Sequence, residues 1–371
     1  MNPVTVLILA PAPDPAAGPL TGVLDEARTV FAEGHRHAFL TAGASRVVVH
    51  REPPDDSLFG ARLRRLLGEL RPQGLVVIGA SSMVLATPAD RAAFVQAAAA
   101  DTPAALANSY YSADAVAIAC AEPVLRDLPV DLASDNALPR WLAEVAGLDV
   151  RDLRERRDLA VDVDSPLDLL LLDGARSWPG QVPVPNDDDS APVRQRLQAL
   201  REVALDPSTE LLVAGRVAAA DLRRIERGTR ARTRAIVEER GMRTAALAAT
   251  RGHPNRRPPR SMLADLIGGT TPARLGEVVG RYADGALIDT RVLLAARLGA
   301  YERAWPTPED RYASDLLLAD RVRDPWLREL TDAAASSPVP IVLGAHTLVG
   351  PGAPLALGIG FGPDAEPREA R

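Results

Sequence analysis

The segment from Leu159 to Leu172 reads Leu-Ala-Val-Asp-Val-Asp-Ser-Pro-Leu-Asp-Leu-Leu-Leu-Leu, and it decides how the first half of the chain is interpreted. Its apolar start predicts a β-strand over Leu159–Val163, which brings Asp162 and Asp164 to the end of that strand. Side chains two apart on a strand share one face, so we expect these two carboxylates to point at the same place. Paired carboxylates suit a hard divalent cation. The sequence therefore predicts a Mg²⁺ site formed by Asp162 and Asp164.

The residues that follow have the pattern of a helix start. Ser165 is a preferred N-cap residue, Pro166 suits the first helical position, and Asp168 falls in the first turn. We therefore expect a helix over Pro166–Leu172. The same pattern allows a second interpretation, in which the two acids are exposed side chains at a capped strand-to-helix junction and bind no metal.

Strands and helices alternate through the first half of the chain. Short apolar runs predict strands over Val4–Leu9, Arg46–His50, Leu75–Ile78, Ala104–Leu106, Ala115–Ala119 and Leu159–Val163. Helical spacing predicts helices between them over Thr21–Glu33, Leu58–Leu70, Pro88–Ala100 and Leu138–Ala146. This alternation predicts an α/β fold with a Rossmann-like, mostly parallel sheet and helices on both faces.

The composition changes after this α/β domain, which we assign to residues 1–173. Residues 174–192 are rich in Pro and Gly and contain three successive aspartates, which is typical of a linker. Residues 193–350 are expected to form a mainly α-helical second domain, and residues 351–371 a loose C-terminal tail. The predicted helices of the second domain are Val193–Val203, Ala218–Arg240, Arg260–Ile267, Pro272–Tyr282, Arg291–Leu298, Pro308–Leu318 and Pro325–Ala335. Two strand-like runs, Glu210–Ala214 and Val339–Leu343, either pair with each other or extend the first sheet.

The amino-acid composition excludes several classes of function. All 43 of the Lys+Arg residues are arginine, so mechanisms that need a lysine, such as a P-loop or a Schiff base, are excluded. The net charge is −6, with no pronounced basic patch, which argues against nucleic acid as a partner. No apolar run reaches the roughly 20 residues that span a bilayer, and the start lacks a basic region, so we expect a cytoplasmic protein without membrane contact. A homo-oligomer remains possible.

The loops after the predicted strands contain the candidate binding residues. Ala10, Gly79, Ser81 and Ser82 follow two strands, and ligands in open α/β sheets bind outside the carboxyl ends of the strands. Small residues and serine hydroxyl groups at this edge can contact a bound anion. These four residues are the predicted nucleotide-binding residues.

Two motifs resemble the nucleotidyltransferases of the GT-A-like fold, especially the molybdenum-cofactor guanylyltransferase and phospholactate guanylyltransferase groups. Residues 161–169 are similar to the Asp-hydrophobic-Asp-Thr-Pro-Glu-Asp-Leu segment that closes those domains, and residues 74–90 to their central strand-loop-helix. The resemblance covers about residues 3–172. It implies that Asp162 or Asp164 helps to hold Mg²⁺ beside nucleotide phosphates, and that the ligand is a nucleotide or a phosphorylated small molecule.

The chain departs from this family at two places. Ser81 and Ser82 stand where the family has a metal-binding aspartate, and the loop Ala10–Pro19 lacks the family's Gly-rich sequence and its lysine. Loss of a single group that stabilises charge in the transition state commonly costs about 10²–10³ in rate. The leading hypothesis is thus a divergent nucleotidyltransferase-like protein that binds nucleotide, with Mg²⁺-dependent transfer left open. The alternative is a non-enzymatic regulatory or partner protein that kept the fold and lost the catalytic residues.

Four further polar residues are candidate substrate contacts. Asn108 and Tyr110 follow a predicted strand and form either a substrate wall or a polar loop with packed tyrosines. Asp289 and Arg291 lie within an apolar run, and charged residues are seldom buried unless they are paired. They form either an ion pair that links helices or a polar pocket. A third possibility places the active site in the second domain, with Asp289, Arg291 and His346 as its candidates.

Overall fold

The computed structural model describes residues 2–52, 58–173, 181–238, 260–268 and 271–360. The chain divides into two compact units. Unit 1 consists mainly of Asp25–Val163 together with Met1–Ala16. Unit 2 consists mainly of Pro183–Arg371, together with Ala17–Leu24 and Asp164–Arg176. The division after Val163 separates Asp162 from Asp164.

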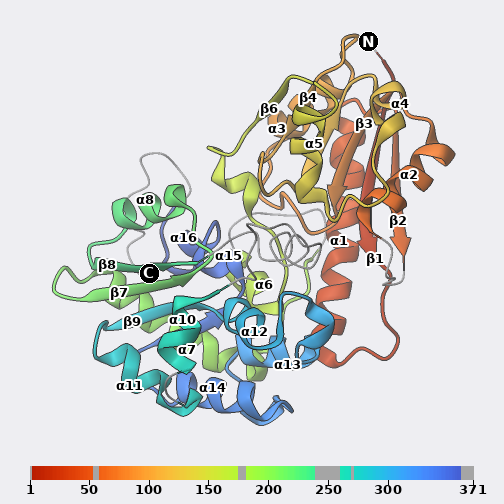
Figure 1. Ribbon diagram of the computed structural model, residues 1–371. Coiled ribbons are helices and arrows are strands. Elements are labelled where there is room, and N and C mark those ends of the chain that lie inside the picture. The colour runs from red at the N-terminus through yellow and green to blue at the C-terminus, as the bar shows by residue number, and fades with distance from the viewer. Residues whose placement is uncertain (1, 53–57, 174–180, 239–259, 269–270, 361–371) are drawn as a thin grey trace. The chain divides into compact units, whose positions relative to one another are not determined.

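Unit 1 contains a six-stranded mixed sheet in the order β2-β1-β3-β5-β4-β6. Its strands are β1 (Val4–Pro11), β2 (Arg46–Glu52), β3 (Gly74–Gly79), β4 (Ala105–Ala107), β5 (Ala115–Ile118) and β6 (Val150–Asp152). β1 pairs in parallel with β2 and β3, whereas β5 is antiparallel to both of its neighbours. Figure 1 labels β1, β2, β3, β4 and β6 of this sheet. The α/β class predicted from sequence is confirmed.

Helices cover both faces of this sheet. They are α1 (Pro19–Thr41), α2 (Phe59–Leu70), α3 (Pro88–Ala98), α4 (Ala121–Val124) and α5 (Leu138–Glu144). Val6 and Ile8 of β1 belong to one buried cluster with Phe39 of α1. Leu7 belongs to a second cluster with Leu63 of α2. Alternate residues of one strand thus face two cores, which explains why β1 is an uninterrupted apolar run.

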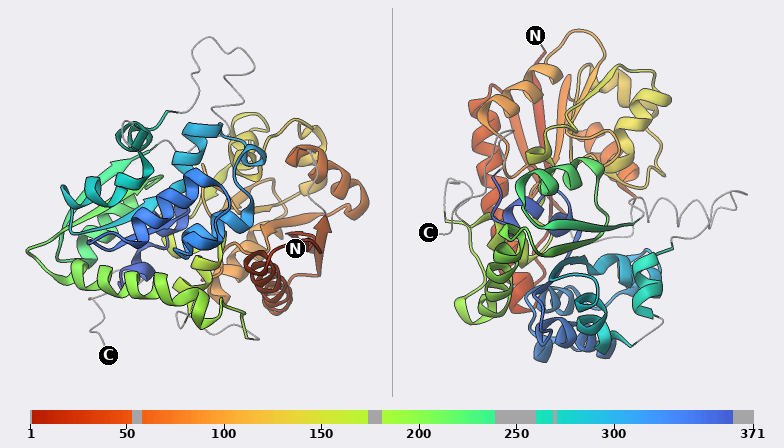
Figure 2. Two further views of the ribbon diagram at one scale, coloured as in Figure 1. Left: turned by 90° about the horizontal axis from the view of Figure 1, so that it is seen from below. Right: turned by 90° about the vertical axis from the view of Figure 1, so that its left-hand side faces the viewer.

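Unit 2 contains a second sheet, and all its strands are parallel. The strands β7 (Glu210–Gly215), β8 (Arg232–Val237), β9 (Gly285–Asp289) and β10 (Ile341–Gly344) have the order β10-β9-β7-β8. Helices flank this sheet, and Figure 2 shows them from two further sides. They are α6 (Pro166–Leu172), α7 (Asp187–Leu205), α8 (Ala219–Gly228), α10 (Met262–Gly268), α11 (Leu275–Gly280), α12 (Thr290–Leu298), α13 (Pro308–Asp315), α14 (Pro325–Ala335), α15 (His346–Val349) and α16 (Ala353–Ala356). Among the described helices, none combines the length and apolar character needed to cross a membrane.

Several predicted elements differ from the structure. Leu159–Val163 is not a strand: Arg157–Ala160 is a 3-10 helix, and the following residues are extended without a ladder partner. The predicted helix Ala218–Arg240 is α8 followed by β8. β8 pairs only with β7 and is largely exposed, so its arginines alternate with smaller residues and do not form an apolar run. β9 was not predicted, because its apolar run continues directly into α12.

The segments expected to be loose contain helices. α7 begins at Asp187, inside the predicted linker 174–192, where the Asn186 side chain accepts a hydrogen bond from the Asp189 amide. The three aspartates occupy its first turn, where negative charge is favoured by the helix dipole. α16 lies within the predicted tail 351–371. Residues 174–180 and 361–371 lie outside the described residues.

Candidate functional site

In unit 1, the direction in which successive strands are added to the sheet reverses between β1 and β3, and we call this point the strand reversal. From β1 the chain passes through α1 to β2 on one side, whereas from β3 it passes through α3 to β4 on the other. β1 and β3 pair directly, with Leu9 opposite Gly79. Ala10 and the loop after Gly79, which contains Ser81 and Ser82, therefore lie together at the carboxyl edge. Open α/β sheets bind their ligands outside such a reversal.

The loop after β3 is held by backbone contacts. The Ala80 amide donates to the Leu9 carbonyl at 2.8 Å, and the Ser82 amide donates to the Gly79 carbonyl at 3.2 Å. A Cβ atom at Gly79 would stand 2.6 Å from the Ser82 hydroxyl oxygen. The serine side chain packs against the glycine, so a larger residue at position 79 would displace Ser82.

A buried histidine supports this loop. His35 on α1 is fully buried, and its Nε2 lies 2.9 Å from the Ser82 carbonyl oxygen. Because a carbonyl only accepts, Nε2 is the donor. Burial, with the Arg91 charge as the second cause, lowers the pKa of His35 to about 3. The imidazole is therefore neutral at neutral pH and acts as a brace for the loop.

Asn108 and Tyr110 contact other parts of unit 1. The Asn108 amide is buried; its Nδ2 donates to the Leu159 carbonyl at 3.0 Å, and its Oδ1 accepts from the amides of Asp114 and Ala115. The Tyr110 hydroxyl lies 3.3 Å from Glu144. Asn108 thus braces the backbone around β5, and its contact with a substrate stays a prediction, as does that of Tyr110.

The predicted Mg²⁺ ligands belong to different units. Asp162 is buried in unit 1. Asp164 is in unit 2, is 49% exposed, and places Oδ2 3.5 Å from His346 Nδ1. Among the described residues, no three His, Cys, Asp or Glu side chains are grouped to hold a metal ion. Mg²⁺ binding by Asp162 and Asp164 stays a prediction.

The first turn of α1 belongs to unit 2, and a carboxylate caps it there. Glu309 accepts hydrogen bonds from the Leu20 amide at 3.1 Å and from the Thr21 amide and hydroxyl at 3.0 Å each. Free helix N-termini are common anion sites. Because these donors are already bonded to Glu309, they do not form an anion site here.

Unit 2 has its own strand reversal, between β7 and β9. The chain leaves β7 for β8 on one side and β9 for β10 on the other. Gly215, the last residue of β7, has φ of +144°, and a Cβ atom there would lie 2.3 Å from the Asp289 Cβ. Glycine is therefore needed at this position, because the backbone turns in a region that other residues rarely adopt and passes close to Asp289.

Asp289 and Arg216 form an ion pair at this reversal. The Asp289 carboxylate is fully buried and accepts from Arg216 Nε at 2.6 Å and Nη2 at 3.1 Å. Its Oδ1 also accepts from the Arg291 amide. Burial, the largest single effect, would raise the pKa of Asp289, but the charge and hydrogen bonds of Arg216 together with the His346 and Arg291 charges outweigh it, so the pKa lies below its ordinary value. Asp289 is therefore an ionised partner of Arg216.

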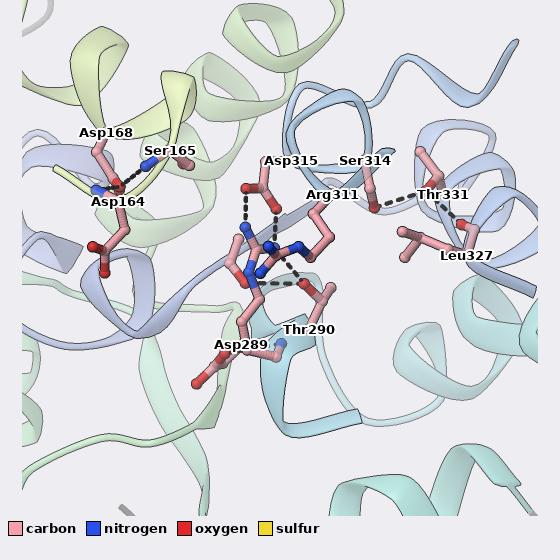
Figure 3. Close-up of polar contacts among 12 residues, drawn as sticks. Asp164, Ser165, Asp168, Asp289, Thr290, Arg311, Ser314, Asp315, Leu327 and Thr331 are labelled. Carbon is pink, nitrogen blue, oxygen red and sulfur yellow. Dashed lines mark hydrogen bonds and ion pairs between the residues drawn. The ribbon is translucent and has the colours of Figure 1, made fainter. Parts of the chain in front are cut away.

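Arg291 forms a second buried ion pair. Its two terminal nitrogens donate to the Asp315 carboxylate at 2.5 and 2.6 Å, and Nη1 also donates to the Thr290 hydroxyl. That hydroxyl donates to the Gly344 carbonyl of β10 at 3.1 Å. Figure 3 labels Thr290 and Asp315 of this group. Asp289 and Arg291 thus each have a separate ion-pair partner, and their contact with a substrate stays a prediction.

Asp168 is a buried acid with an unusual pKa. Its Oδ2 accepts from the amides of Asp164 and Ser165, both at 2.9 Å, as Figure 3 shows. Its Oδ1 has no hydrogen-bond partner among the described residues. Burial, reinforced by the Asp164 charge, raises the pKa of Asp168 to about 8. The carboxyl group is therefore mostly protonated at neutral pH.

Sequence reasoning missed three residues of these clusters. Arg216 directly follows a buried strand, so the same strand-end rule that selected Ala10 would have found it. Asp315 lies inside a predicted helix and gives no separate signal. His35 gives no sequence signal for its role, because its burial against the loop after β3 depends on tertiary packing.

Comparison with known proteins assigns no family to this chain. No model of a known protein family matches it, and no curated protein matches it. The function is therefore argued from the residues and their geometry.

Proposed function

We propose that this chain is a divergent nucleotidyltransferase-like protein that binds a nucleotide or a phosphorylated metabolite in unit 1. The binding site lies at the carboxyl edge of the sheet, between β1 and β3. One observation carries the proposal: the strand reversal brings Ala10, Gly79, Ser81 and Ser82 together at this edge. Ligands of open α/β sheets bind at this place for topological reasons.

The chemistry of the loop supports an anionic ligand. Gly79 leaves room for the Ser82 side chain beside the backbone, which keeps that hydroxyl group at the carboxyl edge. The hydroxyl groups of Ser81 and Ser82 can donate hydrogen bonds to phosphate oxygens. His35 fixes the carbonyl of Ser82, so the loop is arranged before the ligand arrives.

Binding without efficient transfer is the chemistry that these residues support. Nucleotidyl transfer needs groups that stabilise developing phosphate charge. The chain has no lysine, and serines stand where the resembling family has an aspartate. We infer a binding protein whose turnover, where present, is slow. A regulatory or partner protein that binds no nucleotide is the alternative.

The two functions are separated by thermal unfolding with GTP, CTP, ATP and UTP, each with and without Mg²⁺. Nucleotide binding predicts a concentration-dependent rise in the unfolding midpoint for at least one of them, because a ligand that binds only the folded state stabilises it. The Ser81→Ala/Ser82→Ala variant should lose most of that rise. Ser336→Ala, an exposed hydroxyl change on unit 2, is the matched control and should keep it. The absence of a shift with all four nucleotides refutes nucleotide binding in unit 1.

The Mg²⁺ prediction is tested in the same experiment. If Asp162 takes part in holding Mg²⁺, Asp162→Asn should remove the additional shift that Mg²⁺ produces and leave the shift without Mg²⁺ unchanged. An additional shift that survives in Asp162→Asn contradicts the assignment of this residue.

A further inference from the structure

A pocket of about 450 Å³ opens at the other end of the unit 1 sheet. It is lined by the second half of α2, by the two residues Arg71 and Pro72 after that helix, by α4 and by the 3-10 helix Leu125–Asp127, and Figure 1 labels α2 and α4. Pro72 precedes β3, and the Ala121 amide donates to the Gln73 carbonyl at 2.7 Å, which ties the start of α4 to this edge. β3 has six residues, so the pocket is about 20 Å from the carboxyl edge.

The pocket is rich in positively charged side chains. Arg64, Arg71 and Arg126 line it, against a single acid, Glu122. Its walls also include Leu67 and the buried residues Pro72, Ala121 and Leu125. None of the three arginines forms an ion pair with a described residue, in contrast to Arg65, which pairs with Glu69 on the same helix. The pocket thus combines an apolar floor with a net charge of about +2 from these side chains.

Arg71 has a backbone conformation that favours glycine. It is the C-cap of α2, with φ of 43° and ψ of 56°, in the left-handed region. Glycine is the usual residue there because it has no Cβ penalty. A strained arginine whose side chain lines a pocket is the kind of outlier from which a binding role is inferred.

We propose that this pocket binds a phosphate monoester carried on an apolar or aromatic group. Two or three guanidinium groups match the charge of a phosphate dianion, and guanidinium forks donate paired hydrogen bonds to its oxygens. The floor around Leu67 and Leu125 accommodates the apolar part. The volume suits a small organic molecule. The site is separate from the proposed nucleotide site and does not depend on it.

Three probes separate charge from apolar contact in calorimetric titrations at low salt: 1-naphthyl phosphate, 1-naphthol and inorganic phosphate. The proposal predicts that 1-naphthyl phosphate binds at least tenfold more tightly than either of the others, and that salt weakens its binding. Arg64→Ala/Arg126→Ala should weaken it at least tenfold. Arg65→Ala is the matched control and should leave the affinity unchanged.

Arg71→Gly separates a binding role from a structural one. Removing the strained conformation should raise the unfolding midpoint by about 2 °C or more. The same variant should weaken 1-naphthyl phosphate binding at least threefold. An affinity that is unchanged in Arg71→Gly or in Arg64→Ala/Arg126→Ala overturns the proposal, and so does equal binding of 1-naphthol. Binding lost instead in Ser81→Ala/Ser82→Ala would place the probe at the nucleotide site and also overturn it.

Discussion

Asp168 makes the stability of unit 2 depend on pH in a way that one substitution should remove. The pKa of Asp168 is about 8 in the folded chain and 3.8 ordinarily. Between these values the folded state holds a proton that the unfolded state has lost, so stability falls as the pH rises. Each pH unit corresponds to about 1.4 kcal/mol, so the group lowers the free energy of unfolding by about 3 kcal/mol between pH 5 and pH 7.

Asp168→Asn keeps an oxygen to accept the amide hydrogen bonds of Asp164 and Ser165 but does not titrate. We expect the difference in unfolding free energy between variant and native chain to change by about 3 kcal/mol in favour of the variant from pH 5 to pH 7. Urea unfolding at pH 5, 6, 7 and 8, followed by tryptophan fluorescence, measures it. Taking the difference removes the contribution of other titrating groups.

A second variant tests the cause of the shift. Asp164→Asn removes a neighbouring negative charge that raises the pKa of Asp168, so its pH dependence should be shallower than that of the native chain. Parallel curves for native and Asp168→Asn proteins over this range would refute the reasoning, because they would mean that Asp168 is ionised in the fold.

Three further predictions concern other groups. The pKa of His35 is lowered to about 3 from 6.5, so the unfolded state binds a proton first as the pH falls, and the free energy of unfolding decreases below pH 6.5. His35→Gln should remove about 2 kcal/mol of that decrease at pH 5, as measured by urea unfolding. Arg291→Leu leaves Asp315 buried without its partner and should lower the free energy of unfolding by about 3–5 kcal/mol. The double variant Arg291→Leu/Asp315→Leu should recover much of that stability, and an equal loss in the single and double variants would contradict a buried pair. Gly215→Ala should cost at least about 2 kcal/mol, and a neutral effect in the same assay would exclude the close approach to Asp289.

The sequence predicted elements best where one local rule was sufficient. β1 and β3 are continuous apolar runs between breaker residues, and their observed bounds extend the predicted ones by two residues in all for each strand. α6 and α14 begin with a capping residue followed by proline, and their bounds match the predictions. The second sheet was harder to predict. β8 is a polar edge strand that resembles a charged helix, and β9 runs into α12 without a turn.

Among the candidate site residues, too, some could be placed from sequence and others could not. Ala10 and Gly79 could be placed together from sequence, because parallel strands end at one edge. The burial of Asp289 and Arg291 was also predictable, since both lie in an apolar run. Their partners were not, because Arg216 is 73 positions from Asp289 and Asp315 is 24 positions from Arg291, and only tertiary packing selects them.

The central claim is that a nucleotide or phosphorylated metabolite binds at the carboxyl edge between β1 and β3. Hydrogen exchange of the native chain, measured by mass spectrometry with and without saturating GTP or CTP, tests it directly. We expect slower exchange in peptides that cover residues 79–87, with no change in β10 of unit 2. Unchanged exchange over residues 79–87, or protection confined to unit 2, would contradict it.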